Sequence, residues 1–417
     1  MIKILPEISN EFLSDDNFVP HFQPIINTIT RDILGYEVLG RIYSPNRKDY
    51  LSLGSFFHGK TTNLSEKVQV DRLIREKAIR YLKSTGSNTK LFFNMMPNML
   101  STIHQEELLD PTRFHMIQLV EKYGINKENI IIEITEDEFQ GKMERLLKMV
   151  EIFRNYGFKI AIDDVGVGFS NLERIGYIHP DIIKVDIKIM RESLGSNSFM
   201  QVLTALSEMS VKLGSELLFE GIETEQELTL AFKMGASLLQ GFYFSKATEN
   251  FQSKQSFSST LKDSLEKFSG IRFMEIVEDF HKLQYLIDTL SSMFEELEEK
   301  VSSDETLRPQ DILAHRLKDF PDHVIHVFLT DMNGYQSSPS YSRVSNNEWF
   351  VSDVNNENNY AWKHYFIKHK SETYFFKKKW GVTKPLYDIQ TQSQYVIFTF
   401  TISNDTILIA RVNWNYR

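Results

Sequence analysis

Acidic and amide side chains recur in this sequence at the ends of short apolar runs. Glu133 interrupts an isoleucine-rich run, Asp163 follows another, and Glu220 closes a third. The whole set of such polar residues comprises Glu37, Asn94, Glu133, Asp163, Asp164, Lys184, Asp186, Glu220 and Gln240. A single acid of this kind is ordinarily explained by a buried salt bridge or a helix cap. Carboxylates that several strands deliver to one place repel one another, and a shared divalent cation relieves that repulsion.

The chemistry of such a site would be that of a hard cation with oxygen ligands. The chain of 417 residues contains no cysteine, which excludes thiolate ligands, thiolate nucleophiles and disulfides. Carboxylate and amide oxygens favour Mg²⁺ or Mn²⁺, and Ca²⁺ less. The adjacent acids Asp163 and Asp164 allow one residue to bridge two ions, as two-metal hydrolases require. Lys184 would orient a nucleophilic water or neutralise a phosphate there, or else serve only in a structural ion pair.

Short runs rich in β-branched and aromatic residues alternate with helical patterns between residue 19 and about residue 250. The runs are Val19–Ile26, Ile33–Ile42, Lys90–Asn94, Ile130–Thr135, Lys159–Asp163, Ile182–Val185, Leu217–Glu220 and Leu238–Phe244. The helical patterns are Glu66–Lys83, Pro111–Tyr123, Asp137–Tyr156, Asn197–Leu213 and Glu225–Met234. Strands separated by helices pair in parallel through crossovers. The number and spacing of these runs predict an α/β fold, a closed (β/α)₈ barrel rather than an open sheet.

One connection departs from this alternation. Only Asn27–Asp32 separates the first two runs, which is too short for a crossover helix. We therefore expect an antiparallel hairpin and a modified barrel with one reversed strand. The carboxyl ends of the parallel strands of a barrel meet at one mouth, where such folds carry out their chemistry. The polar residues named above are expected to face one another there.

Residues 259–305 carry a heptad pattern instead. Apolar residues recur in alternating steps of three and four at Phe273, Ile276, Phe280, Leu283, Ile287, Leu290, Phe294, Leu297 and Val301. Such a seam is typical of one long helix that packs against another helix. The barrel, the C-terminal domain or a second chain must cover it, because an exposed stripe of this size is unusual in a soluble monomer. We expect a homodimer in which this helix takes part, and packing on the chain's own barrel is the alternative.

The residues after this helix predict a small α+β domain. The predicted strands are His323–Thr330, Thr373–Lys378, Tyr395–Ser403 and Thr406–Val412, and the predicted helix is Ala361–Lys368. Turn residues at Asp331–Gly334 follow the first strand. We predict three parts: a barrel over residues 1–258, a linker helix over 259–305 and a small domain over 306–417. The last part would act as a sensor for a small ligand or a protein, or as a dimerisation domain without a ligand.

Charge and hydropathy restrict the partners. The formal net charge is −9 and the sequence pI is about 5.7, which disfavours general binding to nucleic acid polymers or anionic lipid. Lys377–Lys379 accordingly predicts a solvated hairpin rather than a nucleic-acid patch. The first 18 residues lack the apolar run of a signal peptide, and no run approaches the roughly 18 residues of a membrane helix. We expect a soluble, cytoplasmic protein without a membrane span.

The segments that carry the polar residues resemble the motifs of the EAL-domain family, the cyclic di-GMP phosphodiesterases. The matching segments are Phe22–Ile25, Gly35–Arg41, Asn94, Glu133–Glu136, Asp163–Ser170, Asp181–Asp186, Glu220–Thr224 and Gln240–Phe242. They follow the family's order and span about residues 15–255. The family's fold is a barrel with a reversed first strand, in agreement with the strand pattern. More weakly, the order of barrel, helix and C-terminal domain resembles that of YkuI-type proteins, and the C-terminal part is similar to PAS/Cache-like sensors.

The resemblance implies hydrolysis of one phosphodiester bond of cyclic di-GMP to linear pGpG, with one or two Mg²⁺ or Mn²⁺ ions per barrel and Ca²⁺ as a non-productive ion. The implied ligands of the first ion are Glu37, Asn94, Glu133 and Asp163, while Asp163 and Asp164 reach the second. Glu220 is the implied general base, and Lys184 helps to place the attacking water. The implied substrate contacts are Gln23, Leu39, Arg41 and Gln240, and Arg41 suits a phosphate. Glu136 and Glu223 are implied to brace the loop over Asp163–Ser170.

The sequence departs from the family pattern at a few positions. Val38 replaces the alanine of the family's motif, and Met96 replaces the serine usual two residues after the asparagine that corresponds to Asn94. Val165 and Val167 replace phenylalanine and threonine in the loop. These changes leave the ligands intact but alter their support. The alternative to an active phosphodiesterase is therefore a receptor that binds cyclic di-GMP and signals through its C-terminal domain or a partner. An unrelated metal-dependent barrel hydrolase is the third interpretation.

Overall fold

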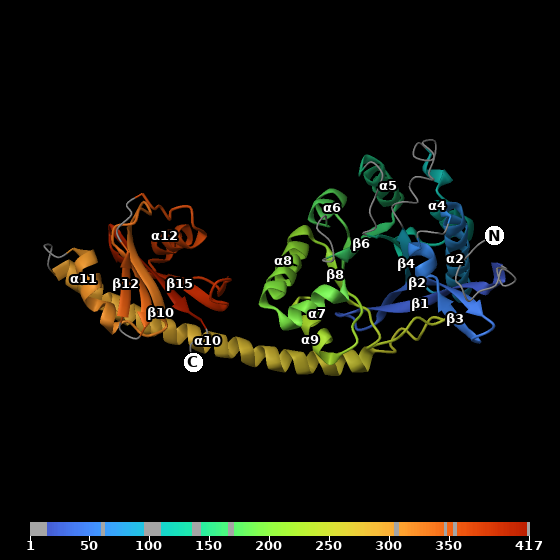
Figure 1. Cartoon of the computed structure of the whole chain (residues 1–417). Helices are drawn as coiled ribbons and strands as arrows, with labels where there is room; N and C mark the ends of the chain where they lie inside the picture. The colour runs from blue at the N-terminus through green and yellow to red at the C-terminus, as the bar shows by residue number, and fades with distance from the viewer. Residues whose placement is uncertain are drawn as a thin grey trace. The chain divides into compact units, whose positions relative to one another are not determined.

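The computed structural model describes residues 15–59, 63–95, 110–135, 143–165, 171–303, 308–345, 348–352 and 357–414. The side chain of Asp164 lies outside this description, as do residues Met96, Glu136 and Val167. The chain divides into two compact units, Met1–Gly270 and Ile271–Arg417 (Figure 1). Across the described ranges, no helix is both long enough and apolar enough to cross a membrane.

The first unit contains a closed barrel with one reversed strand, as the sequence predicts. Its strands are β1 (Phe18–Asn27), β2 (Ile33–Ser44), β4 (Lys90–Met95), β5 (Ile130–Ile134), β6 (Lys159–Val165), β7 (Ile182–Val185), β8 (Glu216–Phe219) and β9 (Leu238–Leu239). The pairings from β2 through β4 to β9 are parallel, and β1 pairs antiparallel with both β2 and β9, which closes the barrel. An extra strand, β3 (Asp49–Ser52), pairs antiparallel with the C-terminal end of β2.

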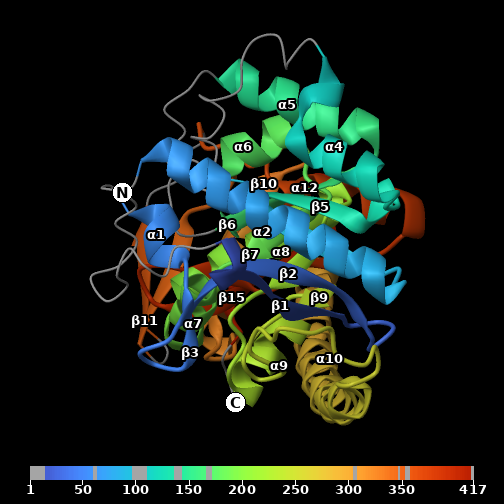
Figure 2. The same cartoon turned by 90° about the vertical axis from the view of Figure 1, so that its right-hand side faces the viewer.

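Helices surround this barrel (Figure 2). They are α1 (Gly54–His58), α2 (Leu64–Thr85), α4 (His115–Tyr123), α5 (Met143–Tyr156), α6 (Asn171–Ile178), α7 (Ile187–Gly195), α8 (Asn197–Leu213) and α9 (Glu225–Lys233). The longest of them, α2, packs against β1 and β2. It begins where the Asn63 side chain accepts a hydrogen bond from the Ser65 N–H, and it ends at Gly86 in the left-handed conformation. These caps define the two ends of α2, and its buried residues, among them Ile74, Ala78 and Leu82, face the barrel.

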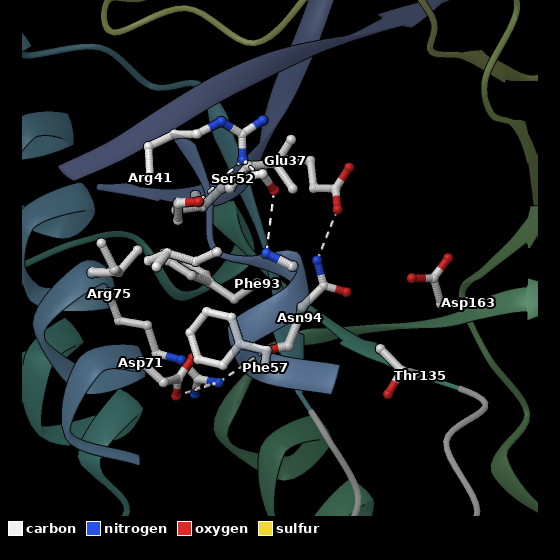
Figure 3. Close-up of a pocket in the computed structure, with 16 residues that line it drawn as sticks. Glu37, Arg41, Ser52, Phe57, Asp71, Arg75, Phe93, Asn94, Thr135 and Asp163 are labelled. Carbon is white, nitrogen blue, oxygen red and sulfur yellow. Dashed lines mark hydrogen bonds and ion pairs between the residues drawn. The ribbon is translucent and has the colours of Figure 1, made fainter. Parts of the chain in front are cut away.

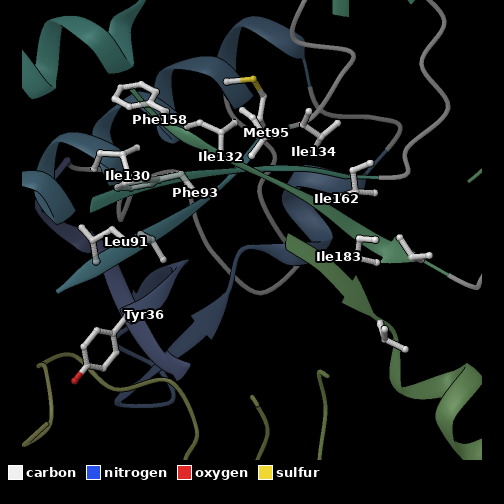
Figure 4. Close-up of a cluster of buried hydrophobic side chains, with 14 of the residues drawn as sticks. Tyr36, Leu91, Phe93, Met95, Ile130, Ile132, Ile134, Phe158, Ile162 and Ile183 are labelled. Carbon is white, nitrogen blue, oxygen red and sulfur yellow. The ribbon is translucent and has the colours of Figure 1, made fainter. Parts of the chain in front are cut away.

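Residues on each barrel strand alternate between an outer and an inner apolar layer. Figure 4 shows members of the outer layer, including Leu91, Phe93, Ile130 and Ile132, which pack with the surrounding helices. The inner layer is a separate cluster of buried side chains, formed by Ile25, Phe92, Ile131, Ala161, Ile182, Leu218 and Leu238. Successive side chains of a strand point to opposite faces, so the next inward position along each strand lies two residues further on. The inner apolar layer thus forms a floor beneath whatever occupies those positions.

The second unit contains an antiparallel sheet of the order β12-β11-β10-β16-β15-β13, with β14 paired to β15. The strands are β10 (Val324–Asp331), β11 (Ser340–Ser345), β12 (Glu348–Ser352), β13 (Trp380–Val382), β14 (Leu386–Asp388), β15 (Ser393–Ser403) and β16 (Thr406–Asn413). The helices α11 (Pro309–Arg316) and α12 (His364–Phe376) complete a small α+β domain, as predicted. The turn at Asp331–Gly334 is also confirmed, because the Gly334 N–H donates to the Asp331 carbonyl.

One predicted strand of this domain is wrong. Thr373–Lys378 was expected to be extended, but Thr373 to Phe376 form the last turn of α12, and Lys377 ends it in the left-handed conformation. The aromatic residues Tyr374–Phe376 have a high propensity for strands, and this propensity led to the wrong prediction of a strand. The helix prevails because Phe366 and His369, three residues apart on one face, are buried in the domain. Its exposed end carries the aromatic residues.

The long helix α10 (Ser258–Ser303) contributes to both hydrophobic cores. Leu261 is buried in the barrel unit, whereas Leu290, Phe294 and Leu297 are buried in the core of the C-terminal sheet. The later part of the heptad seam is therefore covered within its own unit, by the sheet and by Ile312 and Leu313 of α11, so a second helix of the same chain takes part there. The seam's first three positions remain exposed, at 64% for Phe273, 38% for Ile276 and 64% for Phe280.

This difference within one seam predicts unequal effects of truncation. Phe294 packs against the rings of Phe320, Phe398 and Phe400 at centroid distances of 5.8, 5.9 and 5.6 Å. Phe294→Ala should destabilise the C-terminal unit by about 3–5 kcal/mol, because it removes a fully buried ring. Phe280→Ala, at an exposed position, should change stability by less than about 0.5 kcal/mol.

Urea unfolding followed by tryptophan fluorescence checks this prediction, since all four tryptophans lie in the C-terminal unit. Equal unfolding midpoints for the two variants would contradict the assignment of Phe294 to the core.

Candidate active site

Polar side chains form a layer directly above the inner apolar floor of the barrel. Each of six parallel strands carries a polar residue two positions after a floor residue. These pairs are Phe92 and Asn94, Ile131 and Glu133, Ala161 and Asp163, Ile182 and Lys184, Leu218 and Glu220, and Leu238 and Gln240. Glu37 is paired with Phe92 across β2 and β4, and Gln23 with Glu37 across β1 and β2. The predicted convergence at one mouth is therefore what strand periodicity produces.

The Lys184 ammonium lies at the centre of this layer. Its Nζ is 2.9 Å from Glu133 Oε1, 3.0 Å from Asp163 Oδ1 and 2.7 Å from Glu220 Oε1. The side chains of Lys184 and Glu133 are fully buried, while Glu220 retains 23% exposure. One cation thus holds together three carboxylates that come from three different strands.

Burial and charge act in opposite directions on these groups. Burial raises the pKa of Glu133 and of Glu220 well above the usual range, although the Lys184 ammonium opposes the shift. Burial by itself would lower the pKa of Lys184, but the carboxylates of Asp163, Glu133 and Glu220 together raise it. Lys184 therefore remains an ammonium at neutral pH, and the raised pKa of Glu133 and of Glu220 means that these two carboxylates bind protons more tightly than ordinary glutamates.

Glu37 is fixed by two amides. Its Oε1 accepts a hydrogen bond from Asn94 Nδ2 at 2.8 Å (Figure 3). Its Oε2 accepts one from Gln240 Nε2 at 2.7 Å. Because Asn94 donates through its Nδ2, its side-chain oxygen is not used in this hydrogen bond with Glu37. Two predicted metal ligands and a predicted substrate contact are joined in one chain of hydrogen bonds.

The position of Glu220 depends on the glycine that follows it. Gly221 has a φ of +64°, and a Cβ at this position would lie 2.8 Å from Ile187 Cβ. A residue with a side chain would be strained there both by its backbone conformation and by this contact. The glycine lets the chain turn from β8 toward α9 while Glu220 stays at the mouth.

A cavity of about 260 Å³ opens beside this layer (Figure 3). Glu37, Asn94 and Asp163 line it together with the predicted substrate residues Leu39 and Arg41. Arg41 Nη1 donates to the Gly40 carbonyl at 3.0 Å and lies 3.4 Å from Ser52 Oγ, and burial lowers the Arg41 pKa. The cavity thus combines acids at one side with a guanidinium that can meet an anion.

Other predicted residues do not line this cavity. Gln23 Nε2 donates to the Ser245 carbonyl at 3.5 Å, and Gln240 Nε2 donates its hydrogen bond to the Glu37 carboxylate. Glu223 is paired with Arg191 at 3.0 Å on the adjoining helix. The predicted loop over Asp163–Ser170 and its predicted brace Glu136 lie largely outside the described residues. The Glu223 side chain is therefore described here only by its ion pair with Arg191.

The donor set fits a hard divalent cation, although the acids are not gathered as a finished site. Among the described residues, no group of three acidic or histidine side chains is placed to hold a metal ion as it stands. Both carboxylate oxygens of Glu133 are buried and without a hydrogen bond, however, although Oε1 is ion-paired with Lys184. A buried oxygen of this kind is costly unless a cation meets it. Asn94, Glu37 and Asp163 supply further oxygen donors at the same mouth, so the residues fit the implied metal.

The cavity also contains residues that the sequence analysis missed. Asp71 and Arg75 on α2 line it from the side opposite the mouth residues, and Phe57 lies beside them. Arg75 is buried on the same helix face as Ile74 and Ala78. An arginine on the apolar face of an amphipathic helix, four residues after an aspartate, is the signal that could have found this pair.

Comparison with known proteins agrees with the fold. Residues 7–247 match the EAL domain, and residues 251–417 match the EAL-domain associated signalling protein domain. This chain belongs to the EAL-domain family. It is 28% identical over 406 residues to YkuI of Bacillus subtilis, an uncharacterized EAL-domain containing protein, and this match covers 96% of this chain and 95% of YkuI.

A solved structure of YkuI and one further relative add to this comparison. A crystal structure of Bacillus subtilis YkuI in complex with substrate c-di-GMP and calcium superimposes with a TM-score of 0.83 at 24% identity, over 97% of this chain and 96% of that one. It therefore has the same fold. The probable cyclic di-GMP phosphodiesterase PdeG of Escherichia coli is 25% identical over 58% of this chain and 46% of its own length.

The charge balance of the mouth predicts a stability change that depends on pH. Lys184→Met leaves Glu133, Asp163 and Glu220 without their common cation, which should cost about 3–5 kcal/mol at pH 8 without metal. The pKa values of Glu133 and Glu220 are raised in the folded protein, so protonation favours the folded state. The loss should therefore be smaller at pH 5 and should grow as the pH rises.

Denaturation in EDTA, followed by circular dichroism at pH 5 and pH 8, measures this loss. Lys188→Met removes an exposed lysine from α7 and is the matched control. A loss for Lys184→Met that is the same at both pH values would contradict the assigned charge balance.

Proposed function

We propose that this chain hydrolyses one phosphodiester bond of cyclic di-GMP to linear pGpG with the help of divalent cations. The observation that carries the proposal is the gathering of Glu37, Asn94, Glu133, Asp163 and Glu220 at one barrel mouth beside a cavity. Family membership supports it, as does the similarity to a probable cyclic di-GMP phosphodiesterase. The YkuI complex with c-di-GMP and calcium supports the choice of ligand through its common fold.

In this proposal Glu37, Asn94, Glu133 and Asp163 hold one ion, and Asp163 with Asp164 holds a second. Bound Mg²⁺ or Mn²⁺ supplies electrostatic stabilisation of the developing charge and a lowered pKa of bound water. Ca²⁺ is proposed to bind without supporting turnover. The proposed ligands come from different strands, apart from the adjacent pair on β6, and Glu37 lies in the middle of β2.

The chain's own residues supply the proton transfer and the orientation of the substrate. Glu220 accepts the proton of the attacking water, for which it must be ionised. Lys184, 2.7 Å from Glu220, holds this carboxylate and orients the water. Arg41 meets a phosphate, and Leu39, Gln23 and Gln240 contact the remaining substrate. Glu136 and Glu223 are proposed to brace the loop that begins at Asp163.

A receptor function is the second candidate. It is favoured by Val165 and Val167, which replace the phenylalanine and threonine of the family motif shortly after the proposed metal ligand Asp163. Such a protein would bind cyclic di-GMP at the same mouth without hydrolysing it. Measurement of pGpG distinguishes the two functions directly.

The C-terminal part is proposed to regulate the barrel. We keep the division into a barrel (1–258), a linker helix (259–305) and a PAS/Cache-like sensor or dimerisation domain (306–417) as part of the proposal. A small ligand or a protein would bind the last part. A cytoplasmic location also remains a proposal.

The Glu220 assignment predicts a loss of turnover with retained binding. Glu220→Gln should lower the rate of pGpG formation about 10²–10⁴-fold, because it removes the general base and leaves the shape of the site. Burial raises the pKa of Glu220, so the wild-type rate should rise with pH over a range above that of an ordinary glutamate. The variant should lack this limb of the pH profile.

Chromatography of reactions with Mn²⁺ or Mg²⁺, and with chelator, tests the assignment. Glu225→Gln, an exposed change on α9, is the matched control and should keep wild-type turnover. Tight binding of cyclic di-GMP by the wild type without any pGpG in either metal would exclude the enzyme and favour the receptor.

The exposed part of the seam predicts a homodimer. Phe273 and Phe280 lie two turns apart on α10, and a second copy would cover them. We expect the full chain to be dimeric at micromolar concentration and the double variant Phe273→Glu, Phe280→Glu to be monomeric. Light scattering measures both. A monomeric wild type would contradict the dimer, and a dimeric double variant would place the interface elsewhere.

A further inference from the structure

Arg75 is a buried cation outside the cluster at the barrel mouth. It belongs to α2, and its side chain is 8% exposed. Its Nη2 donates to the main-chain carbonyl of Asn94 at 2.8 Å and lies 2.9 Å from Asp71 Oδ2. The guanidinium therefore joins a helix on the outside of the barrel to the strand that carries a proposed metal ligand.

The Asn94 carbonyl needs such a partner because of where it lies in the sheet. The pairing of β2 with β4 extends only to Glu37 and Phe92, and Asn94 follows two residues later. Asn94 is only partly buried, but a carbonyl beyond the end of a ladder still needs a donor from protein or water. Arg75 is that donor, so the backbone of β4 at Asn94 is held by a side chain of α2.

The contact continues a chain of polar interactions through the cavity. Asp71 pairs with Arg75, Arg75 bonds to Asn94, and Asn94 Nδ2 donates to Glu37 at 2.8 Å (Figure 3). Gln240 donates to the other carboxylate oxygen of Glu37 at 2.7 Å. Four of these five residues line the cavity. A displacement of the Asn94 main chain would therefore move its amide relative to Glu37, the other proposed ligand on this side.

We propose that Arg75 is a positioning residue for the metal site, which sets Asn94 and through it Glu37 in the geometry that a divalent cation requires. The inference rests on the proposed function, in which these two residues are ligands. The support for Asn94 thus comes from α2.

The obvious alternative is a purely structural ion pair between Arg75 and Asp71, and two variants separate the roles. Arg75→Met removes both contacts. Arg75→Lys has a side chain one atom shorter, so it keeps a charge for Asp71 one turn away on its own helix but gives up the Asn94 carbonyl. A structural ion pair predicts that the lysine restores wild-type behaviour. A positioning role predicts that it does not.

The experiment measures Mn²⁺ affinity from the electron paramagnetic resonance signal of free Mn²⁺, without substrate. Arg75→Met and Arg75→Lys should each weaken Mn²⁺ binding about 10–100-fold, the usual range for residues that orient metal ligands. Arg80→Met, an exposed change on the same helix, should leave the affinity unchanged. Thermal unfolding of Arg75→Lys should stay close to that of the wild type. In turnover assays its kcat should recover at saturating Mn²⁺.

Each outcome has a definite meaning. Wild-type Mn²⁺ affinity in Arg75→Lys overturns the inference, and this variant decides the matter if Arg75→Met does not fold. A wild-type chain that binds no Mn²⁺ overturns the inference together with the proposed metal site. Mn²⁺ binding without pGpG formation overturns only the proposed activity, and the positioning role is then judged by affinity alone.

Discussion

The arrangement of the barrel mouth depends on a charge imbalance that only cations can relieve. Glu133, Asp163 and Glu220 share the single ammonium of Lys184, and Glu37 lies beside them with both oxygens occupied by amides. Removing several like charges from water is costly unless each finds a partner. The raised pKa of Glu133 and of Glu220 expresses that cost. Additional positive charge at the mouth would lower it, which is why the same residues suit divalent cations and a proton transfer from water.

The strand period converts this requirement into a fold. A floor of apolar side chains such as Phe92 and Leu218 fills the barrel. The polar residues follow these floor residues by two positions along each strand, so they point inward in the next layer above the floor. A shift of one strand by a single residue would move its ligand to the outer layer. The reversed strand β1 closes the barrel and sets Gln23 opposite Glu37. The register between strands is thus as important to the site as the identity of its residues.

The sequence was sufficient for the features that follow from local periodicity. The apolar runs predicted the strands, and the polar residues inside them, such as Glu133 and Lys184, predicted that a polar site lies at the barrel mouth. It was insufficient where tertiary packing decides. Thr373–Lys378 has strand propensity but largely continues a helix whose other face is buried, and Phe294 meets a sheet although its heptad spacing suited a helix. Arg75 was missed because nothing in the spacing of α2 states which strand its guanidinium reaches.

The helix α10 connects to the mouth through contacts within the first unit. Phe268 packs on Phe232 of α9 with a centroid distance of 5.4 Å, and Lys267 pairs with Glu225 at the start of α9. The N-terminus of α9 is fixed by the reciprocal hydrogen bonds of Thr224 and Glu227, and Glu220 precedes it by only four residues. Regulation requires two states that both sites distinguish. A displacement of α10 would reach Glu220 through α9 before it reached Asn94, whose support comes from α2 on another side of the barrel. Glu220 and Asn94, the proposed general base and a proposed metal ligand, are thus supported by different helices, while Lys184 joins Glu220 directly to Glu133 and Asp163.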